Sequence, residues 1–535
     1  MKNLRRKAAH EPEPAGDYLA RGLALQQEGR LQAASELYRQ GLERAPGDPQ
    51  LHFALAHCAY EQADYAAAIG HYQALLKLKP EHLQGWLNLG SLFARLQDTD
   101  RAITCLQQAV RLDPTDAARF SYLLVQSWAA MLEPAARFAL FELWNRLHGR
   151  PLEPQQPTYP QDRDPGRRLR LGYVSGEFFY VSATLLFMPL FQLADREHFE
   201  IFAYSNNARQ DQVTERIRQG CDHFVQVQDL SDEQLAERIR ADRIDLLVDL
   251  SGHTQYHRLG VFAGRPAPLQ FTGLGFVSTT GLSAIQYRFT DRWITPPELE
   301  PFNSEQCLFL PSLMYWQPVN DIQPYYSPNL PALERGDISF GCVNPPFKVN
   351  HQVLSLWARI LAACPGSRLL CKSPGFEQPG LQQRYREAFA RAWVGPERLV
   401  FAGATPLPEH LRFLHQIDLA LDPFPYQGGI TTCESLAMGV PVLSLTGGTG
   451  TSNGVLGALG LSELIAASED DYLAKALALA HQPEKLSHWR RELPQRLTRS
   501  AVCDPESRVR AIETHYRQCW KQLTVGEKGL SSLNC

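Results

Sequence analysis

A glycine pair followed by hydroxyl and acidic side chains, near the C-terminal end of the chain, has the composition of an anion-binding turn. Within Asp422–Leu445 an apolar run ends at Asp422-Pro423 and the chain turns through Gly428-Gly429. The first amides of a helix lack intrahelical acceptors and carry partial positive charge, so they bind phosphate. An ordinary turn between a strand and a helix capped by a threonine is the alternative. The side chains that could add contacts to phosphate and ribose are Thr431, Thr432 and Glu434.

Composition limits the classes of protein that could use such a turn. The 535 residues are 44% hydrophobic and 21% charged, and the net charge of −4 argues against a nucleic-acid partner. We find no signal sequence and no apolar run of about 18 residues, so we expect no membrane partner. The 11 cysteines lack CxxC spacing, which predicts reduced thiols in the cytoplasm and no metal site.

A 34-residue repeat opens the chain. Prolines recur at Pro46, Pro80 and Pro114, with small residues at matching intervals between them. Small residues let paired helices pack closely and proline ends the second helix, which predicts tetratricopeptide repeats. We place three repeats and a capping helix pair in residues 17–149, after a disordered lead at residues 1–16. The repeats would form a groove for a protein partner, a spacer, or an arm that joins two copies of the chain. The small residues that recur are Gly22, Ala56 and Gly90, and Ala34, Ala68 and Ala102.

Beyond a proline-rich linker at residues 150–167, strands and helices alternate. This pattern predicts a parallel, doubly wound sheet in residues 168–318, a linker at 319–336, and a second such sheet in residues 337–525. Residues 526–535 form a polar tail. We therefore predict a helical solenoid followed by two Rossmann-like lobes, the GT-B arrangement that holds a nucleotide sugar between them. The polar residues at the carboxyl ends of the first lobe's strands are Ser175, Glu177, Ser251, Gly252, His253 and Thr254.

The order of motifs resembles the O-GlcNAc transferase and SPINDLY family of protein glycosyltransferases, in a bacterial-type form. The matching segments include LRLGYVSGEF, IDLLVDLSGHT, FGCVNPPFKVN and TTCESLAMGVPVLSL. The resemblance implies a metal-independent, inverting transfer of a sugar, usually GlcNAc from UDP-GlcNAc, to Ser or Thr of a protein that the repeats bind. It implies no cofactor beyond the nucleotide sugar.

The resemblance also implies roles for individual residues. Lys348 matches a lysine on the donor diphosphate, where a fixed cation would stabilise the leaving UDP. Asp242 and Asp245 fall near a position that faces the sugar and the acceptor, and His253 could orient the acceptor; all three could instead be structural. The residues that match or flank the nucleotide-sugar site are Asn344, Lys348, His410, Gly428, Gly429, Thr431, Thr432 and Glu434.

The sequence departs from the family on the acceptor side. Where members carry a histidine after the GYVS strand, this chain has Tyr180, Val181 and Ser182. Ile430 also stands where some members have histidine. Two alternatives therefore stay open: a repeat-containing adaptor with a weakened or inactive GT-B domain, and a transferase with another donor, such as GDP-fucose or UDP-glucose.

Overall fold

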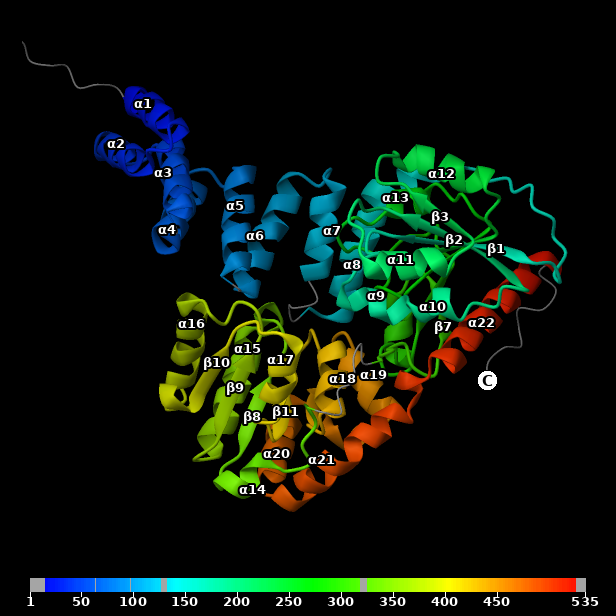
Figure 1. Cartoon of the computed structure of the whole chain (residues 1–535). Helices are drawn as coiled ribbons and strands as arrows, with labels where there is room; N and C mark the ends of the chain where they lie inside the picture. The colour runs from blue at the N-terminus through cyan, green and yellow to red at the C-terminus, as the bar shows by residue number, and fades with distance from the viewer. Residues whose placement is uncertain (1–14, 63, 97, 127–131, 318–324, 526–535) are drawn as a thin grey trace, which may run out of the picture. The chain divides into compact units, whose positions relative to one another are not determined.

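The computed structural model describes residues 15–62, 64–96, 98–126, 132–317 and 325–525 (Figure 1). Residues 1–14 of the predicted lead at 1–16, and the predicted tail at 526–535, lie outside these residues. Ala15 and Gly16, which we placed in the lead, begin the first helix. The chain divides into two compact units, residues 1–114 and 115–535. None of the described helices is long and apolar enough to cross a membrane.

The first unit consists of three helical hairpins, as the 34-residue period predicts. Gly22 faces the Tyr38 ring so closely that a Cβ would lie 2.1 Å from it, and Gly90 packs in the same way on Cys105. Asp98 caps the sixth helix by accepting from the Arg101 amide, so the Asp-Thr-Asp sequence at residues 98–100 forms the start of that helix. The helices are α1 (Ala15–Gln27), α2 (Leu31–Arg44), α3 (Pro49–Glu61), α4 (Tyr65–Leu78), α5 (Leu83–Arg95) and α6 (Thr99–Leu112).

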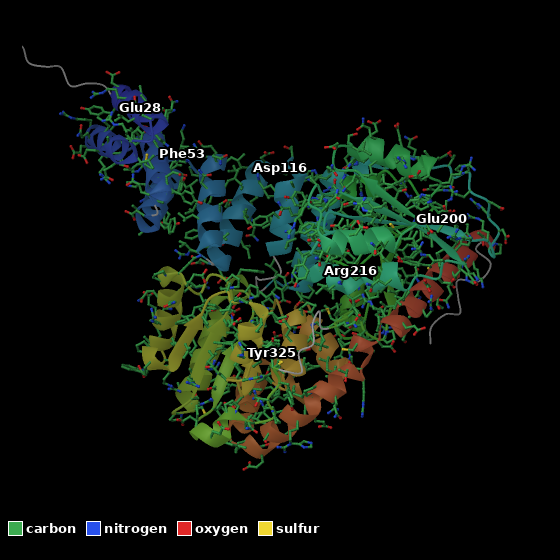
Figure 2. All side chains as sticks on the ribbon, in the orientation of Figure 1. Glu28, Phe53, Asp116, Glu200, Arg216 and Tyr325 are labelled. Atoms are coloured by element: carbon green, nitrogen blue, oxygen red, sulfur yellow. The ribbon has the colours of Figure 1, made fainter. Side chains whose placement is uncertain are left out.

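The second unit begins with a seven-stranded sheet that forms the N-terminal lobe. Its order is β3-β2-β1-β4-β5-β6-β7 and every pairing is parallel. Glu200, which Figure 2 labels, lies near the start of β2. It pairs with Arg170 and His223. The strands are β1 (Leu169–Ser175), β2 (Phe199–Ser205), β3 (His223–Gln226), β4 (Leu246–Asp249), β5 (Leu269–Thr272), β6 (Tyr287–Thr290) and β7 (Gln306–Phe309). The helices are α9 (Ser182–Phe187), α10 (Pro189–Gln192), α11 (Gln212–Gln219), α12 (Asp232–Ala241) and α13 (Leu259–Ala263).

A six-stranded parallel sheet forms the C-terminal lobe, with the order β10-β9-β8-β11-β12-β13. The strands are β8 (Ser339–Cys342), β9 (Arg368–Lys372), β10 (Leu399–Ala402), β11 (Leu419–Leu421), β12 (Val442–Leu445) and β13 (Ile465–Ala466). The helices are α14 (Pro331–Arg335), α15 (His351–Ala363), α16 (Pro379–Ala390), α17 (Leu407–Leu414), α18 (Ile430–Ala437), α19 (Thr451–Ala458), α20 (Glu469–Ala480) and α21 (Pro483–Thr498).

The helices predicted as a cap on the repeats lie in the second unit instead. α7 (Ala117–Gln126) and α8 (Pro134–Trp144) follow the division at residue 114. Ser121 of α7 hydrogen-bonds His253, and Gly281 packs against the Phe141 backbone of α8. The predicted domain of residues 17–149 is thus split because these two helices bury their faces on the N-terminal lobe.

Helix α22 (Pro505–Val525) joins the two lobes. It runs along the N-terminal lobe beside α10 (Figure 1), and Ile512, Tyr516 and Trp520 are part of that lobe's core. The linker at 150–167 also packs on this lobe, where Gln161 donates to the Ile244 carbonyl (2.9 Å). The last helix of the chain therefore completes the first lobe, although the sequence groups it with the second.

Both predicted sheets are confirmed, and the differences concern short or exposed elements. The sequence at residues 221–225 indicates only a lead into a helix, whereas the structure forms strand β3 there; its residues are half-buried or exposed and lack an apolar run. β7 and β13 are not predicted from the sequence either, and each lies at an edge of its sheet. Such short edge strands carry too little hydrophobic pattern to be separated from loops.

Candidate active site

The turn between β11 and α18 is built around a buried carboxylate. Asp422, the first residue after β11, accepts hydrogen bonds from the Gly428 amide and the Ser444 hydroxyl, both at 2.9 Å. Burial raises the pKa of Asp422 to about 6, and these hydrogen bonds oppose the rise. The carboxylate thereby fixes the backbone of the glycine turn through its hydrogen bond with the Gly428 amide.

Gly428 occupies a position with no room for a side chain. A Cβ there would lie 2.6 Å from the Thr432 hydroxyl and 2.9 Å from the Asp422 carboxylate. Gly429 directly precedes α18, whose first amides are the donors that a phosphate would meet. The glycine pair thus brings the backbone close to the helix start, as the sequence predicts.

Lys348 reaches the same turn from the end of β8. It lies in the short helical turn Pro346–Lys348, and its Nζ donates to the Gln427 carbonyl at 2.7 Å. The ammonium also sits 4.5 Å from the centre of the Tyr426 ring. Burial lowers the pKa of Lys348 to about 8, opposed by the charge of Asp422. At neutral pH the turn therefore carries one fixed cation.

The two threonines of the turn differ in exposure. Thr431 is half-buried and donates to Asn344 Oδ1 at 2.9 Å, which links the start of α18 to the segment that follows β8. Thr432 is 2% exposed and shares a hydrogen bond of 2.7 Å with Ser452. Thr431 is thus the hydroxyl that a ligand can reach, and Thr432 supports the turn.

His410 and Glu434 face each other across α17 and α18. The His410 Nε2 and Glu434 Oε2 atoms lie 3.5 Å apart, and both side chains are partly exposed. The structure therefore brings together all eight residues predicted for the nucleotide-sugar site, on the ends of β8 and β11 and the starts of α17 and α18.

His253 is buried between the N-terminal lobe and α7–α8. Its Nε2 donates to the Thr280 carbonyl (2.8 Å) and its Nδ1 accepts from the Ser121 hydroxyl (3.0 Å). Burial lowers the pKa of His253 to about 3, and the neighbouring His257 adds to the effect. Both ring nitrogens are occupied and the ring is neutral, so the structure gives His253 a structural position.

Asp245 lies at the opposite edge of the sheet from the one predicted. It precedes β4, is fully buried, and binds the Arg167 guanidinium (2.7 Å) and the Arg170 amide (2.8 Å) at the start of β1. Asp242 ends α12, where it pairs with Arg238 at 2.8 Å. Ligands of parallel sheets bind at the carboxyl ends of the strands, so neither carboxylate faces the acceptor side.

Comparison with known proteins identifies the family. Residues 141–325 and 328–511 match the model of glycosyl transferase family 41. The chain belongs to this family. Tetratricopeptide repeats match at residues 19–82, 59–117 and 87–131.

Two curated proteins illustrate what the chain is similar to. A protein of Solanum lycopersicum named probable UDP-N-acetylglucosamine–peptide N-acetylglucosaminyltransferase SPINDLY is 33% identical over 385 residues, which cover 70% of this chain and 41% of that protein. The Caenorhabditis elegans UDP-N-acetylglucosamine–peptide N-acetylglucosaminyltransferase is 24% identical, covering 77% and 46%. The chain thus spans less than half the length of these curated relatives.

A solved structure covers nearly the whole chain. A lysine-to-methionine mutant of the Thermobaculum terrenum O-GlcNAc transferase matches with a TM-score of 0.77 at 32% identity. The match covers 96% of this chain and 98% of that one. The order of repeats and lobes is therefore shared with that solved structure.

Sequence reasoning gave no role to Asp422 and Asp249 and named Glu177 only as a polar residue at a strand end. Asp422 marks the end of an apolar run, and an acidic residue at such a point was the available signal. Glu177 lies just after β1 and Asp249 ends β4, and burial raises their pKa values to about 7 and about 6. Burial is what sets these three carboxylates apart, and one sequence does not reveal it.

Proposed function

We propose that this family 41 chain is an inverting protein glycosyltransferase that moves GlcNAc from UDP-GlcNAc to a Ser or Thr hydroxyl, without a metal. The observation that carries the proposal is the meeting of Lys348 with the glycine turn before α18. A cation and oriented backbone amides at one point can stabilise the charge that develops on the departing UDP. The names of the relatives support the donor.

The acceptor's proton needs a base. His253 and Asp245 are committed to buried contacts and Asp242 to an ion pair on α12. The phosphate of the donor itself is a further candidate base, and we assign the role to it. Lys348 and the α18 amides then orient that phosphate toward the acceptor.

We propose that the repeats bind the acceptor protein. A hollow of about 530 Å³ lies on α1, α3 and the start of α5. Its lining mixes apolar side chains with imidazole groups that can hydrogen-bond a peptide backbone. The side chains that line the hollow include Leu19, Leu23, Phe53, His57 and His82.

We place the protein in the cytoplasm, because all ten described cysteines are free thiols.

Calorimetric titration of the whole chain with UDP, GDP and UDP-GlcNAc, without added metal, tests the donor. We expect UDP and UDP-GlcNAc to bind and Lys348→Met to abolish binding. Preference for GDP would redirect the assignment to a fucosyl donor. Absence of binding by any of them would favour the adaptor alternative.

A further inference from the structure

Each lobe has one point at which the order of its strands reverses. In the C-terminal lobe the order reverses between β8 and β11, and the candidate donor site lies there, with Lys348 after β8 and the glycine turn after β11. In the N-terminal lobe the order reverses between β1 and β4. Open parallel sheets bind ligands beyond the carboxyl ends of their strands at such a point. The space beyond β1 and β4 is therefore the corresponding place for a second substrate.

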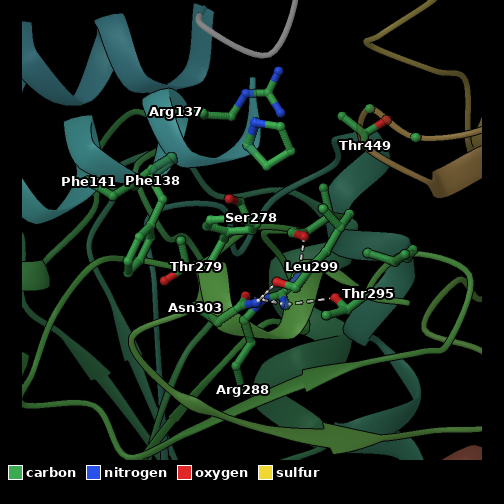
Figure 3. A pocket seen from close by; sticks show the side chains of 16 residues that line it. Arg137, Phe138, Phe141, Ser278, Thr279, Arg288, Thr295, Leu299, Asn303 and Thr449 are labelled. Atoms are coloured by element: carbon green, nitrogen blue, oxygen red, sulfur yellow. Dashed lines mark hydrogen bonds between the residues drawn. The ribbon is translucent and has the colours of Figure 1, made fainter. Parts of the chain in front are cut away.

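The carboxyl ends of the two sheets face each other. One pocket is lined both by Thr279, in the segment after β5, and by Thr449, in the segment after β12 (Figure 3). Gly429 of the donor turn approaches Met314, which follows β7, so closely that a Cβ would lie 3.0 Å from the Met314 Cε. The segment after β1 lies on the same side, because Leu186 of α9 packs against the core of the C-terminal lobe.

Glu177 is a carboxylate without a partner at the reversal point of the N-terminal lobe. It lies two residues after β1 and is partly exposed, and its Oε2 atom is buried without a hydrogen-bond partner among the described residues. Its backbone is fixed, since its amide donates to Ser175 Oγ (3.0 Å) and its carbonyl accepts from Thr184 Oγ1 (2.6 Å). Buried polar atoms are nearly always paired, so this oxygen calls for a ligand that supplies a donor.

The charges around Glu177 favour a cationic ligand. Burial and the negative charge of Asp249, at the end of β4, raise the pKa of Glu177 to about 7, while the neighbouring Thr254 hydroxyl opposes the rise. No Lys, Arg or His of the described residues contributes to this shift of the pKa. Asp249 has donors of its own, the Gly252 amide (2.9 Å) and the Thr272 hydroxyl (2.7 Å). A desolvated carboxylate beside a second one is costly, and a cation would offset that cost.

Two exposed tyrosine rings belong to the segments next to this carboxylate. Tyr256 is 52% exposed and has φ of 63°, a left-handed conformation that is strained for a bulky residue. It packs over Gly176, where a Cβ would lie 2.5 Å from the Tyr256 Cβ, and its carbonyl accepts from Asn206 Nδ2 (2.8 Å). Tyr180 is 54% exposed and lies three residues after Glu177. Aromatic faces attract cations, so these rings and the carboxylate suit the same ligand group.

We propose that Glu177, together with the exposed rings of Tyr180 and Tyr256, binds a Lys or Arg side chain of the acceptor protein near the Ser or Thr that receives the sugar. The ammonium or guanidinium group supplies both the missing hydrogen-bond donor and the missing positive charge. This inference rests on the proposed function, because it names the sequence preference of that reaction. The hydroxyl groups of the donor sugar are the other donors that could meet Glu177, and the test separates them from a basic side chain.

Transfer to matched peptides tests the inference. Each peptide has a single serine in an alanine background, and one position within three residues of the serine holds Lys, norleucine or Glu. The whole chain is incubated with UDP-GlcNAc and each peptide, and mass spectrometry measures the product. We expect kcat/KM to be about fivefold higher or more for Lys than for norleucine at one position at least, because a partly desolvated charge contact contributes on this scale. Glu177→Gln should abolish this preference, and Glu177→Lys should shift it to the Glu peptide.

Two controls show that a lost preference is not a loss of the fold. Glu177→Gln should unfold at no lower denaturant concentration than the wild type, because the substitution removes the repulsion with Asp249. Glu237→Gln makes the same change at an exposed position of α12 and should keep the preference for Lys.

Equal kcat/KM for the Lys and norleucine peptides would overturn the inference, as would a Lys preference that survives in Glu177→Gln; the proposed function stands in both cases. If Glu177→Gln loses transfer to every peptide, norleucine included, then Glu177 serves the donor sugar and the inference is wrong. Transfer to none of the peptides by the wild type would count against the proposed function. Calorimetric titration of the UDP-bound chain with the Lys and norleucine peptides would then decide, and equal binding would overturn the inference.

Discussion

The two lobes have the same strand order through their first six strands, yet their polar strand ends differ. In the C-terminal lobe, Lys348 and Thr431 stay partly exposed around the start of α18. In the N-terminal lobe, Asp249 and His253 are buried and bound to their own lobe or to α7. The shared topology thus places a possible ligand-binding edge in each lobe, and the exposure of the polar side chains there distinguishes the two edges.

The largest expected effect comes from removing the cation of the C-terminal lobe. Lys348→Met should lower the release of UDP from UDP-GlcNAc about 10³-fold, because one preorganised charge at a leaving group contributes on this scale. Lys475→Met is the matched control, since Lys475 also donates to a carbonyl, that of Ile465, but on α20. Wild-type turnover in Lys348→Met would show that the edge of the C-terminal lobe is not the donor site.

The second prediction concerns Asp245, which the resemblance placed near the sugar and the acceptor. Asp245→Asn should lower the free energy of unfolding by about 3–5 kcal/mol, because it leaves Arg167 without its buried partner. The turnover of the folded fraction should not change. Asp470→Asn, at an exposed pair with Arg359, should cost less than about 1 kcal/mol. Chemical denaturation measures the free energy of unfolding of both variants. Loss of turnover without loss of stability in Asp245→Asn would show that Asp245 acts in the active site.

A smaller effect is expected from adding a methyl group at Gly428 in the glycine turn. Gly428→Ala should weaken UDP binding about tenfold, since its Cβ would displace Thr432 and Asp422, and overpacking of this kind costs about 1–3 kcal/mol. Gly380→Ala in α16 has no heavy atom within 4 Å of the new Cβ and serves as the control. Calorimetry with UDP measures both variants. Unchanged affinity in Gly428→Ala would mean that the turn does not approach the ligand.

The smallest effect is a dependence of stability on pH in the N-terminal lobe. The pKa of His253 in the folded chain is about 3, below its ordinary value of 6.5. On acidification through pH 6.5, His253 therefore binds a proton in the unfolded chain but not in the folded chain, and this stabilises the unfolded chain. His253 should therefore cost about 1.4 kcal/mol of stability at pH 5.5 relative to pH 7.5.

His257, whose pKa burial lowers to about 4, acts in the same direction. His253→Phe should remove only the part due to His253, so the slope of stability against pH between 7.5 and 5.5 becomes shallower. Denaturation at several pH values measures this slope. A slope that stays the same in the variant would mean that His253 titrates freely and is open to an acceptor.

Much of the fold follows from local pattern alone. The 34-residue period predicts the three hairpins, and apolar runs such as the one at β1 predict the central strands of both sheets. The same patterns mislead at α7 and α8, whose helical periodicity is correct but whose buried faces belong to the second unit. Periodicity shows that a helix has a face to bury and does not show what covers it.

The sequence by itself determined the glycine turn, the lysine after β8 and the hydroxyls at the start of α18, because short-range spacing and backbone chemistry specify such a site. Only the tertiary structure decided that Asp245 lies at the amino ends of the strands of its sheet and that His253 is enclosed by α7 and α8. Both properties depend on burial and on partners more than 70 positions away in the chain, and no local pattern records such contacts.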